Sequence, residues 1–144
     1  MTALYVETSA LVRALVGSDT AVASAMREAT DLVTSALTGL EAARAIARLR
    51  RDGHLSPAGE RDSLRRLAEF ERSAGTRSID DEVLRAARRE FPAEPVRSLD
   101  AIHLATLSLL DAAEEQIAVL STDRRVRENV LAMGFEVLPR DEGT

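Results

Sequence analysis

Four acidic residues stand where chemistry is often concentrated, directly after predicted strands or in the first turns of predicted helices: Glu7, Glu41, Asp100 and Asp123. Glu7 follows the apolar run 4–6, and Asp123 follows the run 117–121. Because the carboxyl ends of parallel strands meet at one edge of a sheet, we expect these carboxylates to converge there.

Several carboxylates in one cleft repel one another, and the repulsion raises the pKa of each. A divalent cation removes that repulsion, and Mg²⁺ is usually held by carboxylates together with waters and substrate phosphates. Such a cation lowers the pKa of a bound water and neutralises charge on a phosphodiester. The four acids are therefore compatible with a Mg²⁺ site that acts on phosphate esters.

Each acid also has a purely structural interpretation. Thr38 and Glu41 have the spacing of a capping box. Asp100, in a first helical turn, complements the helix dipole. Asp123 suits an N-cap, and Glu7 suits an ordinary polar position after a strand. Spacing alone does not choose between these interpretations and a metal site.

The rest of the composition excludes other chemistries. The 144-residue chain has no Cys, and its 19 basic residues are all Arg. This rules out a thiol nucleophile, a thiolate zinc site, a Schiff-base lysine and a Walker A lysine. The absence of Lys also argues against a phosphorylation receiver. Residues 7–9, Glu-Thr-Ser, lack the paired aspartates of a haloacid-dehalogenase-type phosphatase.

Helical periods alternate with short β-type runs along the chain. Strands are predicted at 4–6, 32–35, 76–79, 117–120 and 135–138, and helices at 10–15, 21–29, 40–51, 57–73, 81–90, 99–110 and 123–133. Thr8 or Ser9 is expected to cap the first helix. In the fourth helix, Leu64, Leu67 and Ala68 predict one buried face. The alternation indicates an α/β fold, with a mainly parallel sheet covered by helices on both faces.

Four segments resemble the motifs of PIN-domain proteins, in the same order and at similar intervals. They are 5–12 (YVETSALV), 37–45 (LTGLEAARA), 97–105 (RSLDAIHLA) and 120–124 (LSTDR). The third segment is the most specific, and the likeness covers nearly the whole chain. Within the family, the size of the chain suggests the VapC-type toxins of bacterial toxin–antitoxin pairs.

The resemblance implies a single PIN-like domain over residues 1–144, folded as a three-layer α/β/α sandwich with a mainly parallel sheet of four or five strands. It implies an endoribonuclease that depends on Mg²⁺ or Mn²⁺, a homodimer, and a small cognate antitoxin that blocks the active site. The family's acidic positions map onto Glu7, Glu41, Asp100 and Asp123. We expect Glu7 and Asp100 to bind metal directly, and the other two to act through waters.

Position 7 departs from the family pattern, which has Asp there. Glu keeps the charge but adds one methylene. Three interpretations stay open: Glu7 binds metal directly in an adjusted site, it binds through a water in a slow enzyme, or the chain is an attenuated form. The last extends to a non-catalytic PIN-like module that binds RNA or protein.

Residues beside the four acids could contact an RNA substrate. Thr8, Ser9 and Thr122 carry hydroxyls suited to a phosphate or to a metal-bound water. Arg44 shares the helix face of Glu41 and could guide RNA phosphates. His103 lies on the same helix side as Asp100 and is interpreted as a packed or paired core residue rather than a base.

The charge and hydropathy of the chain bound its partners and its location. A net charge of −5 argues against nonspecific coating of nucleic acid, although residues 38–77 hold nine Arg against six acidic residues. No apolar run approaches the roughly 20 residues of a membrane span. Residues 1–4 show no basic region ahead of a long apolar stretch, so a cytoplasmic protein without membrane contact is expected.

Overall fold

A parallel sheet with β1 at its centre organises the fold. The computed structural model describes residues 2–17, 19–111 and 116–141, and within them five strands pair in the order β3-β2-β1-β4-β5. The strands are β1 (Ala3–Val6), β2 (Leu32–Ser35), β3 (Gly75–Arg77), β4 (Ile117–Leu120) and β5 (Glu136–Leu138). Every pairing is parallel, and Tyr5 is in register with Val33 on one side and Val119 on the other. The predicted parallel sheet is confirmed with five strands.

Alternating side chains on the two central strands build a separate core on each face of the sheet. Leu4 and Val6 of β1 pack into one cluster, and Tyr5 between them packs into the other. Successive strand residues point to opposite faces, and every residue of β4 is buried. A strand that is apolar on both faces is typical of a parallel sheet covered by helices on both sides.

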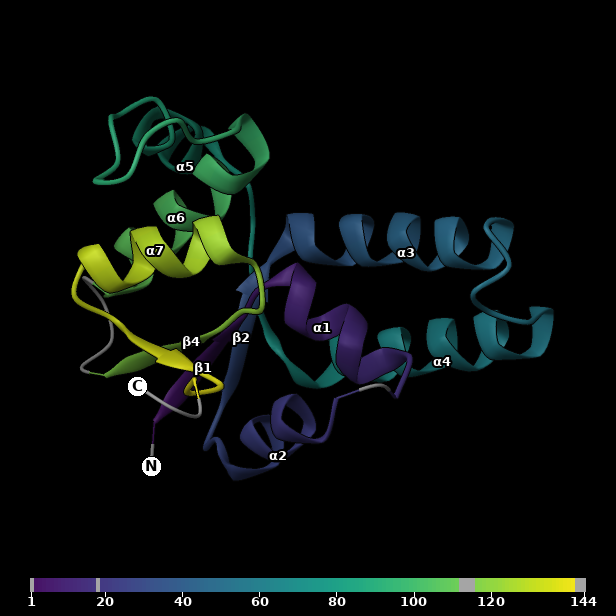
Figure 1. Ribbon diagram of the computed structural model, residues 1–144. Helices are drawn as coiled ribbons and strands as arrows, with labels where there is room; N and C mark the ends of the chain where they lie inside the picture. Colours follow the sequence, from purple (N-terminus) through teal and green to yellow (C-terminus); the bar gives the residue numbers. More distant parts are fainter. Residues whose placement is uncertain (1, 18, 112–115, 142–144) are drawn as a thin grey trace.

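Helices cover both faces and complete the three predicted layers. Their bounds are α1 (Thr8–Leu15), α2 (Thr20–Glu28), α3 (Ala36–Arg51), α4 (Pro57–Ser73), α5 (Asp81–Ala86), α6 (Ser98–Asp111) and α7 (Arg124–Ala132). The first four helices supply the core with Leu4 and Val6, while α6 and α7 supply the core with Tyr5. Figure 1 shows α3 and α4 extending from the sheet as an antiparallel pair.

Ser35, rather than Thr38, begins the third helix, four residues earlier than predicted. The Ser35 hydroxyl accepts a hydrogen bond from Leu37 N, so the helix begins at Ala36. Thr38 lies inside the helix, where its hydroxyl accepts from Thr34 Oγ1. The capping-box interpretation of Thr38 and Glu41 is therefore wrong, and the Glu41 side chain is free to turn toward the sheet.

The structure corrects two further expectations. The predicted helix 81–90 ends at Ala86, before the Phe91-Pro92 break that was expected to stop it. In α4 the buried face consists of Ser63, Leu67 and Phe70, whereas Leu64 is 39% exposed and Ala68 is also exposed.

In the described ranges, no helix is both long enough and apolar enough to cross a bilayer.

Candidate active site

The four predicted acids gather around the point where the strand order reverses. Strands β1 and β4 are neighbours, and the chain continues from β1 to β2 in one direction and from β4 to β5 in the other. Glu7 directly follows β1, and Asp123 lies three residues after β4. Figure 1 shows the first turns of α1, α3 and α7 meeting at this edge. Ligands of open parallel sheets bind at such a position.

Glu7 is a buried carboxylate that caps its own helix. Its residue is 5% exposed, and its Oε2 accepts a hydrogen bond of 3.2 Å from Ser9 N. The Ser9 hydroxyl donates a short hydrogen bond to the same oxygen, and the Ser121 hydroxyl donates another at 2.8 Å. Burial raises the pKa of Glu7, while the hydrogen bonds from Ser9 and Ser121 oppose part of that rise.

Two serines from opposite ends of the chain therefore clasp Glu7. Ser9 Oγ also accepts from Thr122 N at 2.9 Å, and Ser121 Oγ accepts from Asp123 N at 3.1 Å. The pair thus ties the start of α1 to the loop between β4 and α7. We name Ser9 and Ser121 the serine clasp. It fixes Glu7 on one side of the carboxylate and positions the backbone that carries Asp123.

Glu41, like Glu7, is held through one of its two carboxylate oxygens. Its Oε1 accepts from Thr8 Oγ1 at 2.6 Å and lies 2.6 Å from His103 Nε2. Burial alone would raise the pKa of Glu41, but the bonds from His103 and Thr8 outweigh it and bring the pKa below its usual value. With its pKa lowered, the carboxylate of Glu41 is ionised at neutral pH, and its side chain is 23% exposed.

Asp100 and Asp123 contribute the remaining charge from the first turn of α6 and the N-cap of α7. Burial raises the pKa of Asp100, the charge of Asp123 adds to the rise, and that of Glu41 adds less. These influences put the three carboxylates in one electrostatic neighbourhood. Asp123 Oδ1 accepts from Val126 N at 3.0 Å, which confirms that Asp123 is an N-cap.

Each of the four carboxylates keeps at least one oxygen that accepts no hydrogen bond from the described residues. These oxygens are Glu7 Oε1, Glu41 Oε2, Asp123 Oδ2 and both oxygens of Asp100. Within the same part of the chain, no three acidic or imidazole side chains close around a single point as a ready-made cage. An open set of oxygen donors suits Mg²⁺, which keeps several waters and few protein ligands.

Two of the three hydroxyls predicted to contact substrate, those of Thr8 and Ser9, have other partners in the structure. Neither Thr8 nor Ser9 caps α1, because the carboxylate of Glu7 takes that place. Thr8 binds Glu41 instead, and Ser9 belongs to the serine clasp. Thr122 is half-buried and donates its backbone N–H to Ser9. Arg44 is exposed one turn after Glu41 and has no ion-pair partner among the described residues.

Two residues at the site were not singled out for a role there by the sequence. Ser121, 0% exposed, binds Glu7 across the strand-order reversal, and only the S-x-D spacing with Asp123 hinted at it. His103 is 1% exposed and lies between Tyr5 and Glu41, which confirms the expectation of a paired core histidine.

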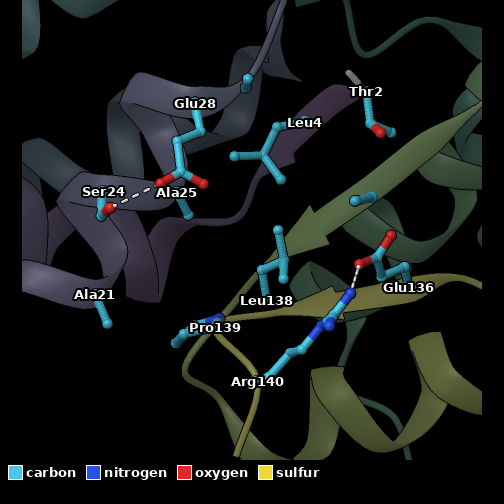
Figure 2. A pocket seen from close by; sticks show the side chains of 12 residues that line it. Thr2, Leu4, Ala21, Ser24, Ala25, Glu28, Glu136, Leu138, Pro139 and Arg140 are labelled. Atoms are coloured by element: carbon cyan, nitrogen blue, oxygen red, sulfur yellow. Dashed lines mark hydrogen bonds and ion pairs between the residues drawn. The ribbon is translucent and has the colours of Figure 1, made fainter.

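The surface around the described sheet is hollowed by several cavities, and two of them are large. One of about 640 Å³ borders Thr122 and is lined by Arg13, Arg124 and Arg127 together with three acidic residues. The other, of about 580 Å³, lies between α2 and the strands, where Leu4 and Leu138 form an apolar floor (Figure 2). None of the four acids lines either cavity.

Comparison with known proteins gives a family and a relative of nearly the same length. The chain matches the PIN domain family over residues 4–130. It is 36% identical over 140 residues to a protein named Ribonuclease VapC35 in two strains of Mycobacterium tuberculosis, CDC 1551 / Oshkosh and H37Rv. That alignment covers 94% of this chain and 95% of the relative.

Three solved structures share the fold at low sequence identity. A toxin-antitoxin complex from Klebsiella pneumoniae has a TM-score of 0.65 at 15% identity, covering 97% of this chain and 99% of that one. FitAB bound to an IR36 DNA fragment has a TM-score of 0.67 at 16% identity, covering 93% and 92%. Mycobacterium tuberculosis VapC20, a toxin that cleaves the sarcin-ricin loop, has a TM-score of 0.61 at 15% identity, covering 92% and 95%. At these identities the likeness shows the fold alone.

Proposed function

The chain belongs to the PIN-domain family and is a relative of a VapC ribonuclease, and we propose its function from that premise. We propose that it is a metal-dependent endoribonuclease and the toxin of a toxin–antitoxin pair. We propose that it acts as one PIN-like domain over residues 1–144 and works in the cytoplasm. Its partners are an RNA substrate, a cognate antitoxin and a second copy of the chain. The toxin–antitoxin complex among the structures of the same fold supports the antitoxin as a partner.

The observation that carries the activity is the set of carboxylate oxygens at the strand-order reversal that accept no hydrogen bond from the residues the structure describes. Glu7 and Asp100 would bind Mg²⁺ or Mn²⁺ directly, and Glu41 and Asp123 would act on its waters. The bound cation would supply a water of lowered pKa and neutralise charge on a phosphodiester. The donor set fits, because an ion with a flexible share of water ligands needs few protein oxygens.

The residues of this chain have distinct tasks in that reaction. The serine clasp holds Glu7 so that Oε1 stays available while Oε2 is engaged. Thr8 holds Glu41 in the same manner. Exposed Arg44 would contact RNA phosphates, and the side chains of Thr8, Ser9 and Thr122 border their path. Water is the attacking group, so no side-chain nucleophile is required, in keeping with a chain without Cys or Lys.

RNA cleavage by an Asp100→Asn variant tests this function. The substitution removes one charge and changes no hydrogen bond with the described residues. We expect the unmodified chain to cleave RNA in the presence of Mg²⁺ or Mn²⁺, and we expect cleavage to stop when EDTA removes the metal. Asp100→Asn should lose about 10²-fold or more in rate, as expected when a group that stabilises charge in the transition state is removed.

The matched control is Asp31→Asn, which removes the same charge from an exposed residue ahead of β2, at the opposite edge of the sheet. It should cleave at the unmodified rate. Equal rates for Asp100→Asn and the unmodified chain would overturn the assignment of the site.

A further inference from the structure

His103 connects a buried tyrosine to an acid of the candidate site. It lies on α6, one helical turn after Asp100, and it is 1% exposed. Tyr5 Oη lies 2.7 Å from its Nδ1, and Glu41 Oε1 lies 2.6 Å from its Nε2. The tyrosine ring meets the imidazole edge-on, with ring centroids 6.0 Å apart. Both ring nitrogens therefore have partners, and the ring has almost no contact with solvent.

The chemistry of Glu41 and Tyr5 indicates which nitrogen of His103 carries the hydrogen. Glu41 is an ionised carboxylate and can only accept, so the Nε2 atom of His103 carries the hydrogen and donates it. A neutral imidazole then has a bare Nδ1, which accepts from the Tyr5 hydroxyl. Burial raises the pKa of Tyr5, and the charges of Glu7 and Glu41 raise it further, so the phenol keeps its proton.

Thr8 is a second hydrogen-bond donor to Glu41, and together with His103 it fixes the orientation of that side chain. Thr8 Oγ1 donates to the same Oε1 that faces His103. Two donors on one oxygen fix the orientation of a long side chain, which would otherwise lose rotamer freedom on binding a ligand. Oε2 then remains as the oxygen that can reach a metal or its waters.

We propose that His103 is a positioning residue, which Tyr5 holds as the Nε2–H tautomer so that, with Thr8, it orients the Glu41 carboxylate for metal binding. This inference rests on the proposed function. His103 is not itself a catalytic residue, because both of its nitrogens are engaged and the ring is buried away from substrate. Removing a residue that orients a metal ligand typically weakens metal affinity by about 10–100-fold.

Two substitutions separate positioning from packing, because each keeps one nitrogen of the ring. The amide nitrogen of His103→Gln takes the place of Nε2 and can still donate to Glu41. The amide of His103→Asn reaches only the place of Nδ1 and can still bind Tyr5. Both remove the imidazole ring, so neither variant keeps its packing against Tyr5.

The measurement is Mn²⁺ affinity, followed by the electron paramagnetic resonance signal of free Mn²⁺, for the full-length chain and both variants. We expect His103→Gln to stay close to the unmodified affinity and His103→Asn to bind about 10–100-fold more weakly. An equal loss of Mn²⁺ affinity in the two variants would overturn the proposal. So would an affinity that His103→Asn keeps and His103→Gln loses.

A second measurement uses the unmodified chain and so does not depend on the folding of a variant. The ¹⁵N spectrum of the imidazole should show a protonated Nε2 and a bare Nδ1. A protonated Nδ1 would overturn the proposal. Failure of the unmodified chain to bind Mn²⁺ would count against the proposed function, while the ¹⁵N spectrum would still decide whether His103 holds Glu41.

Discussion

At the scale of single residues, the extra methylene of Glu7 has a place in the structure. Its carboxylate folds back to cap α1 and accepts from both members of the serine clasp. Ser121 is fully buried and lies 114 residues away in the sequence, so this contact depends on the tertiary fold. Among the three interpretations of position 7, this arrangement supports a site adjusted to Glu over an attenuated one.

Glu7→Asp tests that interpretation. The shorter side chain withdraws the carboxylate by about 1.5 Å, the length of one carbon–carbon bond, and it cannot keep both serine hydroxyls. A misplacement of about 1 Å can cost roughly 10²-fold in rate. We therefore expect Glu7→Asp to cleave RNA more slowly than the unmodified chain. Faster cleavage would show that Glu attenuates a nuclease built for Asp.

Burial of Glu7 also predicts a pH dependence of stability. Because its pKa is raised in the folded state, the folded chain holds the proton more tightly than the unfolded chain does. The free energy of unfolding therefore falls as pH rises from the ordinary glutamate pKa through the raised value. Glu7→Gln should remove the share of that fall that Glu7 contributes and leave the share due to Asp100, whose pKa is also raised, so the metal-free variant is the more stable one at neutral pH.

Urea denaturation in EDTA across this pH range measures the effect. Glu90→Gln, at an exposed position, is the control and should keep the pH profile of the unmodified chain. A Glu7→Gln profile that falls as steeply as that of the unmodified chain would contradict the assignment of the effect to Glu7.

At the scale of elements, Asp123 combines a structural task with the proposed chemical one. It caps α7 through Val126 N, and either Asp or Asn can accept that bond. Asp123→Asn should therefore keep the thermal stability of the chain and lose most of its RNA cleavage. Asp123→Ala should lose activity and also about 0.5–2 kcal/mol of stability.

Asp80→Ala is the matched control, since Asp80 caps α5 through Val83 N. It should lose comparable stability with cleavage unchanged. Full activity in Asp123→Asn would mean that Asp123 is a helix cap and nothing more.

At the scale of the whole molecule, the sequence predicted the architecture well because short-range patterns carry it. The apolar run at 117–120 and the Ser-Pro pair before α4 are local signals, and both elements were found where expected. The start of α3 was missed, because Ser35 and Thr38 both suit an N-cap in sequence and only the end of β2 decides between them. The contacts of His103 with Tyr5 and Glu41 span 98 and 62 positions, and no local pattern could reveal them.

The chemistry of the RNA ends tests the central claim most directly, namely that the carboxylates at the strand-order reversal support hydrolysis by a metal-activated water. The unmodified chain is incubated with RNA and Mn²⁺, and the termini of the fragments are identified by mass spectrometry. Attack by water predicts 5′-phosphate and 3′-hydroxyl ends that form only when metal is present. Fragments with 2′,3′-cyclic phosphate and 5′-hydroxyl ends, formed equally in EDTA, would mean that the RNA 2′-hydroxyl attacks, and they would contradict the account.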